Sequence, residues 1–449
     1  MKIGNCPWSD IFENGYLSLS ECHADTYTCK DLRPERKVTM RILLATYWGL
    51  PSVGGLEKYV LQLKRGLEAR GHEVDIFCRT PDDSGFHILN KGLFLPKREI
   101  QPMISAKADT YFARHLPGLD PEVKFMEVDK YSFEVAAAYF RPAAYDIIHT
   151  QDVISARAFS RIRHARTALV STIHGCLSTE SLARHQADGL WYDDYTKTPL
   201  WRYYGLIEHY GIMQNHETIM PTEWLKGIMV RDFRIPEDRM TTVPNGMDIE
   251  GFLSEMHKPA VTPDAGGRKI ILCSARFDPV KGHVHLLRAL CQLKKVRNDW
   301  VCWLAGNGQL EGRLRELTAA YGLQNEVVFL GKRDDVPALL NKSDIVVLPS
   351  LQDNQPYSIM EAHVAGKPVV ASNAGGIPEM VTHEMTGLIF PAGNEQDLYG
   401  NLLAVLSEDD RRSWLGQQGK EFGRRHWSLP LMTERILAIY EKALQKRWR

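Results

Sequence analysis

The chain lacks several features that would assign it to a specialised class of proteins. None of its apolar runs reaches the roughly 18 residues that a membrane-spanning helix requires. Residues 1–30 do not have the basic-then-apolar order of a secretory signal. Lysine plus arginine and aspartate plus glutamate both number 55, so the formal net charge is zero. That balance argues against a nucleic-acid binder that depends on phosphate contacts. We therefore expect a cytoplasmic protein with no nucleic-acid partner.

Metal-binding and dinucleotide-binding patterns are also lacking. Cys22, His23 and Cys29 could begin a zinc site, but no second C-x-x-C-type pair exists, so we expect no zinc. No G-x-G-x-x-G opens either half of the chain, which argues against a dinucleotide oxidoreductase. The eight cysteines are scattered, and three of them fall in apolar, strand-like runs: Cys78, Cys273 and Cys302. Buried, reduced thiols are expected there.

The order of apolar segments predicts an α/β fold in two domains. After an extension, residues 1–39, strand-like runs occur at 41–47, 73–79, 123–128, 145–150, 168–174 and 217–221. Residues 56–70 have one apolar helical face, and 80–120 are expected to be an irregular excursion. A second set of strand-like runs follows at 269–276, 300–306, 326–331, 344–350, 368–372 and 387–390.

The segment 244–268 is rich in proline and glycine and marks the expected domain boundary. Short apolar strands separated by helices indicate parallel sheets. We predict two Rossmann-like, doubly wound domains that face each other across a cleft. Ligands of such sheets bind beyond the carboxyl ends of the strands.

Two cations lie on the first loop of the second domain. Arg276 and Lys281 are five positions apart in "ARFDPVKG", where Pro279 and Gly282 shape the turn. A guanidinium fork and an ammonium group on one loop could hold a diphosphate. A solvated basic turn is the alternative.

Two acids lie in "LQDNQPYSIMEAHVAGKPVV", residues 351–370. Ser358 and Glu361 form a capping-box pattern, which predicts a helix over 358–365 with Glu361 in its first turn. That carboxylate could also accept hydrogen bonds from ribose hydroxyls, while the helix N-terminus receives phosphate. Asp353 lies eight positions earlier and could reach the sugar of the same ligand. The Gly375–Gly376 turn could approach the ligand or serve as a plain turn.

Three further features leave their alternatives open. His174 ends a strand-like run and is either a site residue or a satisfied polar residue. The aromatic stretch 190–210 could contact sugars or a membrane interface, although packing is an equally simple reading. Residues 160–166, "SRIRHAR", predict a basic helix face that is either solvated or directed at anionic lipid or a phosphorylated acceptor.

These segments together resemble glycosyltransferase family 4, the retaining group with the GT-B fold, over residues 41–445. The resemblance rests on ordered motifs: "GGLEKYVLQLKRGLEARGHEV", "STIHG", "VPNGMDIEGF", "ARFDPVKG", "LAGNGQLEGRLREL", "VVFLGKRDDVPALLNKSDIVVLPS" and "DNQPYSIMEAHVAGKPVVASNAGGIPEMV". It implies transfer of a sugar from a nucleotide-diphosphate sugar with retention of configuration, without a cofactor and without a required metal. The acceptor is a glycan, a lipid-linked sugar or a small-molecule hydroxyl.

The resemblance also implies roles for individual residues. Arg276 and Lys281 correspond to the diphosphate clamp, Glu361 to the ribose-binding acid, and Asp353 to the acid that contacts the donor sugar. His174 corresponds to the histidine near the reacting sugar. The implied donor-binding set also contains Gly54, Gly55, Lys332, Tyr357 and Ser358.

Two departures from the family pattern affect the expected donor. Asp353 stands where the family usually has glutamate, and Asn354, Gln355 and Pro356 replace its Gly-Phe-Gly. The loop is therefore stiffer, and Gln355 could take over part of the sugar contact. Two alternatives stay open: a non-catalytic nucleotide-sugar binder, and an epimerase or phosphorylase on the same fold.

The expected organisation follows from the motifs and the resemblance. Residues 40–245 form an acceptor-side Rossmann-like domain, 246–425 form the nucleotide-sugar domain, and 426–449 form a helix that returns to the first domain. A peripheral contact at the inner membrane face is compatible with the cytoplasmic location.

Overall fold

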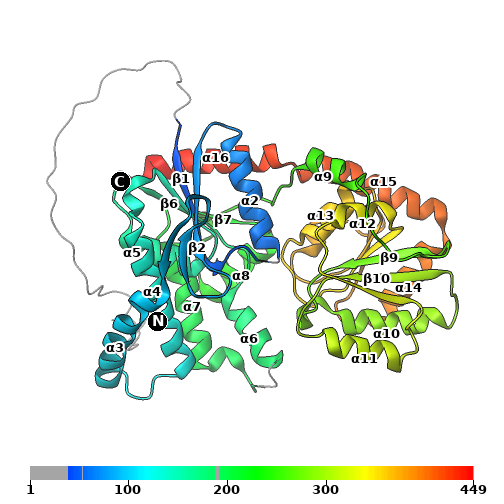
Figure 1. Ribbon diagram of the computed structural model, residues 1–449, viewed down its shortest axis with the longest axis horizontal. Coiled ribbons are helices and arrows are strands. Elements are labelled where there is room, and N and C mark those ends of the chain that lie inside the picture. Colours follow the sequence, from blue (N-terminus) through cyan, green and yellow to red (C-terminus); the bar gives the residue numbers. More distant parts are fainter. Residues whose placement is uncertain (1–38, 53, 188–191, 448–449) are drawn as a thin grey trace.

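The computed structural model describes residues 39–52, 54–187 and 192–447 as two α/β domains joined side by side (Figure 1). Residues 1–38 of the extension lie outside the described residues, and with them Cys22, His23 and Cys29. Both sheets consist mainly of parallel strands with helices on their faces. The predicted fold class is confirmed.

The first domain contains an eight-stranded sheet in the order β4-β3-β2-β1-β5-β6-β7-β8. Its strands are β1 (Arg41–Gly49), β2 (Glu73–Arg79), β3 (Gly85–Ile88), β4 (Leu93–Pro96), β5 (Ile147–Thr150), β6 (Ala168–Thr172), β7 (Glu217–Met220) and β8 (Met240–Thr242). Its helices are α2 (Gly55–Glu68), α3 (Lys97–His115), α4 (Pro121–Tyr139), α5 (Val153–Ile162), α6 (Leu177–Ala187), α7 (Pro199–Met213) and α8 (Glu223–Phe233).

The second domain contains a six-stranded parallel sheet in the order β11-β10-β9-β12-β13-β14. Its strands are β9 (Lys269–Ser274), β10 (Trp300–Ala305), β11 (Val327–Gly331), β12 (Ile345–Leu348), β13 (Val369–Ser372) and β14 (Leu388–Phe390). The remaining helices are α9 (Ile249–Met256), α10 (His283–Lys294), α11 (Glu311–Ala320), α12 (Val336–Lys342), α13 (Tyr357–Val364), α14 (Glu395–Ser407), α15 (Asp409–His426) and α16 (Leu429–Lys446). Cys273 and Cys302 are buried, unpaired thiols in β9 and β10, and Cys78 is another in β2.

Three sequence predictions in the first domain are wrong. Residues 123–128 belong to α4 rather than to a strand, because Asp120 caps the helix and Pro121 begins it. Residues 80–120 are not irregular, since they form the antiparallel β3–β4 hairpin and α3. The basic stretch 160–166 is not a helix face either, because α5 ends at Ile162 and Arg163 is extended.

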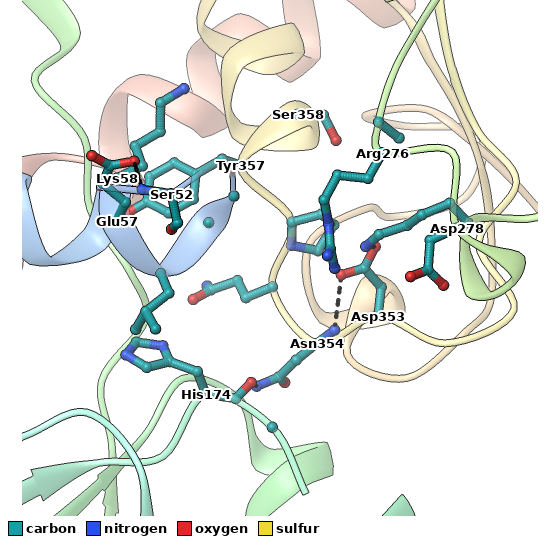
Figure 2. Close-up of a pocket in the computed structure, with 18 of the residues that line it drawn as sticks. Ser52, Glu57, Lys58, His174, Arg276, Asp278, Asp353, Asn354, Tyr357 and Ser358 are labelled. Atoms are coloured by element: carbon teal, nitrogen blue, oxygen red, sulfur yellow. Dashed lines mark hydrogen bonds and ion pairs between the residues drawn. The ribbon is translucent and has the colours of Figure 1, made fainter. Parts of the chain in front are cut away.

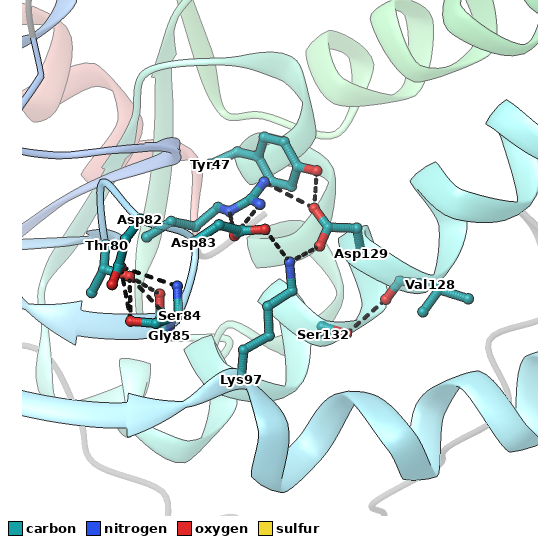
Figure 3. Close-up of polar contacts among 11 residues, drawn as sticks. Tyr47, Thr80, Asp82, Asp83, Ser84, Gly85, Lys97, Val128, Asp129 and Ser132 are labelled. Carbon is teal, nitrogen blue, oxygen red and sulfur yellow. Dashed lines mark hydrogen bonds and ion pairs between the residues drawn. The ribbon is translucent and has the colours of Figure 1, made fainter.

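A cluster of buried charges attaches α3 and α4 to the sheet (Figure 3). The Asp129 carboxylate on α4 accepts hydrogen bonds from the Tyr47 hydroxyl and, at 2.9 Å, from the Arg79 guanidinium. The ammonium group of Lys97 on α3 lies 2.5 Å from Asp129 and 2.7 Å from Asp83. Asp129 is 1 % exposed, so its charge depends on these partners. The cluster therefore holds the two helices in one position on β1 and β2.

The last long helix, α16, crosses back from the second domain and packs against the first (Figure 1). Tyr440 on α16 bonds through its hydroxyl to Nδ1 of His149 on β5 at 2.7 Å, and Nε2 of His149 lies 2.8 Å from the Thr172 hydroxyl. Lys446 pairs with Glu217 on β7 at 2.8 Å. Among the described residues, no helix is long and apolar enough to span a membrane.

The His149 contacts predict a pH-dependent contribution to stability. Burial lowers the pKa of His149 from 6.5 to about 3. We expect His149→Gln to destabilise the first domain by about 2 kcal/mol at pH 7.5, because both side-chain hydrogen bonds are lost. Below pH 6.5 the histidine is protonated in the unfolded wild type but not in the folded protein, so the wild type loses stability as the pH falls.

The variant lacks this titration. The difference in the free energy of unfolding between the wild type and His149→Gln should therefore narrow by about 1.4 kcal/mol per pH unit below pH 6.5. Thermal unfolding of both proteins between pH 7.5 and pH 5 measures it. A difference that stays constant or widens as the pH falls would contradict the buried, neutral state of His149.

Candidate functional site

The two domains enclose a cleft of about 1270 Å³ between the carboxyl ends of their sheets. Its walls contain the first turns of α2, α5, α6 and α8 on one side and the loops after β9, β11 and β12 on the other. Every residue of the expected site lines it: Gly54, Gly55, His174, Arg276, Lys281, Lys332, Asp353, Tyr357, Ser358 and Glu361. Residues from distant parts of the sequence thus meet in one cavity, with α2 and His174 opposite Arg276 and Ser358 (Figure 2).

The second-domain wall carries both an ion-paired cation and unpaired cations. The Lys281 ammonium group lies 2.6 Å from Asp353, which also accepts a hydrogen bond from the Ser350 hydroxyl at 3.0 Å. The side chains of Arg276 and Lys332 are both exposed and have no hydrogen-bond or ion-pair partner among the described residues. The cleft therefore offers two uncompensated cations next to a lysine–aspartate pair.

The N-terminus of α13 opens onto the same wall. Pro356, rather than Ser358, occupies the N-cap position, and no side chain caps the helix. The predicted capping box is therefore wrong, because the helix begins at Tyr357 and Glu361 falls in its second turn. Proline has no side-chain acceptor for the first N–H groups, so these groups and the positive end of the helix dipole face the cleft.

Glu361 contacts the other domain instead of its own helix N-terminus. Its carboxylate is hydrogen-bonded to the ammonium group of Lys58 on α2. The same ammonium group lies 5.5 Å from the centre of the Tyr357 ring, within range of a cation–π contact. The Glu361 side chain is 5 % exposed and that of Lys58 is 44 % exposed. The pair therefore bridges the two domains at a position that lines the cleft.

His174 lies on the first-domain wall and is held in place by two neighbours. Its Nε2 atom lies 3.2 Å from Oε1 of Gln151, and its ring packs edge-to-face on Tyr59 with 4.5 Å between ring centres. Burial lowers the pKa of His174 to about 3, so the ring is neutral at physiological pH. It can exchange hydrogen bonds with a ligand, but it does not supply a positive charge.

The loop between β12 and α13 is bonded to the first domain as well as to its own. The Asn354 amide donates to the backbone oxygen of His174 at 2.9 Å, and its oxygen is bonded to the Thr222 hydroxyl. Gln355 accepts a hydrogen bond from the backbone N–H of Asn245 at 2.7 Å. No pattern in the sequence indicates these roles of Asn354 and Lys58. "GGLEK" drew attention to the α2 loop, but no local pattern shows which side chain crosses the cleft.

The described residues of the aromatic and basic stretches, 192–210 and 160–166, do not line the cleft. Trp191 lies outside the described residues, whereas Tyr195, Tyr203 and Tyr204 are buried in the first-domain core. Packing is therefore the correct interpretation for these three residues. Among residues 160–166, Arg161 pairs with Glu134 on α4 and Arg163 bonds to the backbone of Thr167.

The close approach of Gly375 to Asp353 gives a prediction about the loop. Gly375 has a φ of +58°, and a Cβ atom there would clash with the backbone oxygen of Asp353. We expect Gly375→Ala to destabilise the second domain by about 2 kcal/mol, through the left-handed backbone and the clash. Gly400→Ala is the matched control, because no atom lies within 4 Å of its added Cβ in α14. Thermal unfolding compares the two variants, and equal melting temperatures would contradict the prediction.

Two family models match consecutive halves of the chain. "Glycosyltransferase Family 4" matches residues 53–250, and "Glycosyl transferases group 1" matches residues 257–422. The first match ends at residue 250, inside α9, and the second begins at residue 257, directly after this helix and before β9.

Individual proteins agree with the family models. An uncharacterized glycosyltransferase of Methanocaldococcus jannaschii is 26 % identical over 417 residues, which is 90 % of this chain and 99 % of the relative. Sucrose-phosphate synthase from Thermosynechococcus elongatus has the same fold, with a TM-score of 0.69 at 20 % identity, covering 91 % of this chain and 100 % of that chain. The Anabaena protein HepE in complex with UDP-glucose gives a TM-score of 0.62 at 18 % identity, covering 90 % and 99 %. The chain therefore has the GT-B fold and belongs to the family-4 type of glycosyltransferases.

Proposed function

We propose that this glycosyltransferase moves a sugar from a nucleotide-diphosphate sugar to a hydroxyl group, with retention of configuration and without a metal. The observation that carries the proposal is the second-domain wall. Arg276, Lys332 and the uncapped N-terminus of α13 face one cavity and have no anionic partner among the described residues. Two cations and a set of free N–H groups are the features that bind a diphosphate.

The structural neighbours support the nature of the donor. The solved structures of HepE hold UDP, UDP and glucose, or UDP-glucose. Those ligands belong to a protein with the same fold, and we infer that this chain also takes a nucleoside diphosphate sugar. The base and the sugar are not part of the proposal, because Asp353 and the stiff loop after it depart from the family pattern.

In this proposal the pairs seen across the cleft exchange partners when the donor binds. Glu361 releases Lys58 and accepts hydrogen bonds from the ribose hydroxyls. The diphosphate lies at the N-terminus of α13 between Arg276 and Lys332, and it attracts Lys281 away from Asp353. Asp353 is then free to accept hydrogen bonds from the donor sugar. Gly54 and Gly55 line the opposite side of the cleft, where the absence of side chains lets the backbone approach the ligand.

The chemistry requires one bond to break and one to form. The bond between the anomeric carbon and the β-phosphate oxygen breaks, and the acceptor oxygen bonds to the anomeric carbon. The acceptor's hydroxyl proton passes to the departing phosphate oxygen, and the diphosphate leaves with both bonding electrons. The protein's largest contribution is to stabilise the negative charge that grows on the diphosphate, which is the task of Arg276, Lys281 and Lys332. Neutral His174 orients the sugar by hydrogen bonding.

Calorimetry with UDP, GDP, ADP and their sugars tests the donor, and mass spectrometry of the products tests turnover. We expect Arg276→Ala to weaken binding of the preferred nucleotide by about 10- to 100-fold, because a charge-assisted hydrogen bond to phosphate is lost. Arg313→Ala is the matched control, since Arg313 is exposed on α11 and pairs with Glu316. It should bind the nucleotide as the wild type does.

Turnover separates the enzyme from the alternatives. The wild type should release or transfer the sugar, and Glu361→Ala should lose this activity. Tight binding of a nucleotide sugar without any turnover would favour the non-catalytic binder. Activity that requires orthophosphate and no nucleotide would identify a phosphorylase. Binding of none of the nucleotides would refute the proposal.

A further inference from the structure

The first-domain wall of the cleft differs from the second-domain wall in which groups are bonded to its helix N-termini. The first turns of α5, α6 and α8 all reach the cleft, through Asp152, Leu177 and Trp224 among others. An open helix N-terminus binds phosphate readily. Whether these three can receive an anionic substrate depends on what already occupies them.

Each of the three N-termini is bonded to a carboxyl group of the protein. At α5, Asp152 accepts hydrogen bonds from the backbone N–H of Ser155 at 2.7 Å and of Tyr47 at 2.8 Å. At α6, the buried side chain of Glu208 accepts from the N–H of Leu177 at 2.5 Å. These positions are therefore filled from within the first domain.

The third position is filled from the other domain. At α8, the two carboxylate oxygens of Glu379 accept from the N–H groups of Glu223 and Trp224, at 2.9 and 2.6 Å. The N-cap residue Thr222 also accepts from Leu225 at 3.2 Å. The N-terminus of α2 has no side-chain cap, but Glu57 stands in its first turn and bonds to the N–H of Ser52 at 2.9 Å.

The charged side chains on this wall also act against binding of a phosphate. Among the described residues of the first domain that line the cleft, the acids are Glu57, Asp152 and Glu180, and the one cation is Lys58. The ammonium group of Lys58 is bonded to Glu361. A phosphate on this side would therefore face three acids against the single cation Lys58, and it would find no open helix N-terminus among α5, α6 and α8. Like charges placed opposite each other act against binding.

The same wall suits an uncharged, hydroxyl-rich molecule. Trp48 lines the cleft with 37 % of its surface exposed, and its ring offers an apolar face on which a sugar ring can stack. Carboxylate oxygens such as those of the exposed Glu180 accept hydrogen bonds from hydroxyl groups. We propose that the accepting end of the acceptor is a neutral sugar or polyol without a phosphate, and that the first-domain wall disfavours phosphorylated acceptors. This inference rests on the proposed transfer from a nucleotide sugar.

Matched pairs of acceptors test the inference. The wild type is incubated with the nucleotide sugar that it binds and with glucose or glucose 6-phosphate, mannose or mannose 6-phosphate, and inositol or inositol 1-phosphate. We expect kcat/KM for the neutral member of the best pair to exceed that of its phosphorylated partner at least tenfold. An equal rate, a preference for the phosphorylated member, or donor hydrolysis without transfer to any neutral acceptor would overturn the inference.

A charge reversal on the first-domain wall provides a second test of the inference. Glu180→Lys should raise the ratio of phosphorylated to neutral transfer about tenfold, and Glu180→Gln should raise it less. Glu99→Lys is the control, because Glu99 is exposed on α3 and does not line the cleft. It should leave the ratio unchanged, and thermal unfolding checks that each variant is folded. An unchanged ratio in folded Glu180→Lys would overturn the role of this wall.

Donor binding is measured separately by calorimetry, so that the two proposals fail differently. Absence of nucleotide-sugar binding refutes the proposed function. Intact donor binding together with a preference for phosphorylated acceptors refutes only the inference about the acceptor.

Discussion

The geometry of parallel sheets determines what the cleft can bind. Each strand ends, and the next helix begins, at the same edge of the sheet, so helix N-termini gather wherever two such edges face each other. Every one of them brings unpaired N–H groups and a positive dipole end. The sequence then decides which remain open. Asp152, Glu208 and Glu379 occupy three of them, whereas Pro356 leaves that of α13 without a side-chain cap.

The contacts across the cleft link ligand binding to the relation between the domains. Lys58 reaches Glu361, Asn354 reaches His174, and Glu379 reaches the start of α8. All three second-domain residues lie between β12 and β14, around the open N-terminus of α13. A ligand that takes over hydrogen bonds of Glu361 must exchange with Lys58, and its binding free energy then includes the loss of an interdomain contact.

Local patterns in the sequence predicted much of the fold but less of the site. The strand expected at 73–79 is β2, and the six strand-like runs of the second half contain β9 to β14, because buried parallel strands are short apolar runs between turns. Residues 123–128 also alternate, but Asp120 and Pro121 give a stronger helix-start signal, and α4 forms instead. The capping box failed because Pro356 shifted the start of α13.

The residues that line the cleft were mostly found through motifs, whereas their partners were not. Lys58 and Glu361 are separated by 303 positions in the sequence, and only the folded arrangement of both domains brings them together. The same long-range dependence applies to α16. Its Tyr440 completes the core beside β5, so a nascent first domain leaves the ribosome with that side of its sheet uncovered. Its folding can finish only after the whole second domain has been synthesised, and chaperones have that interval in which to act on it.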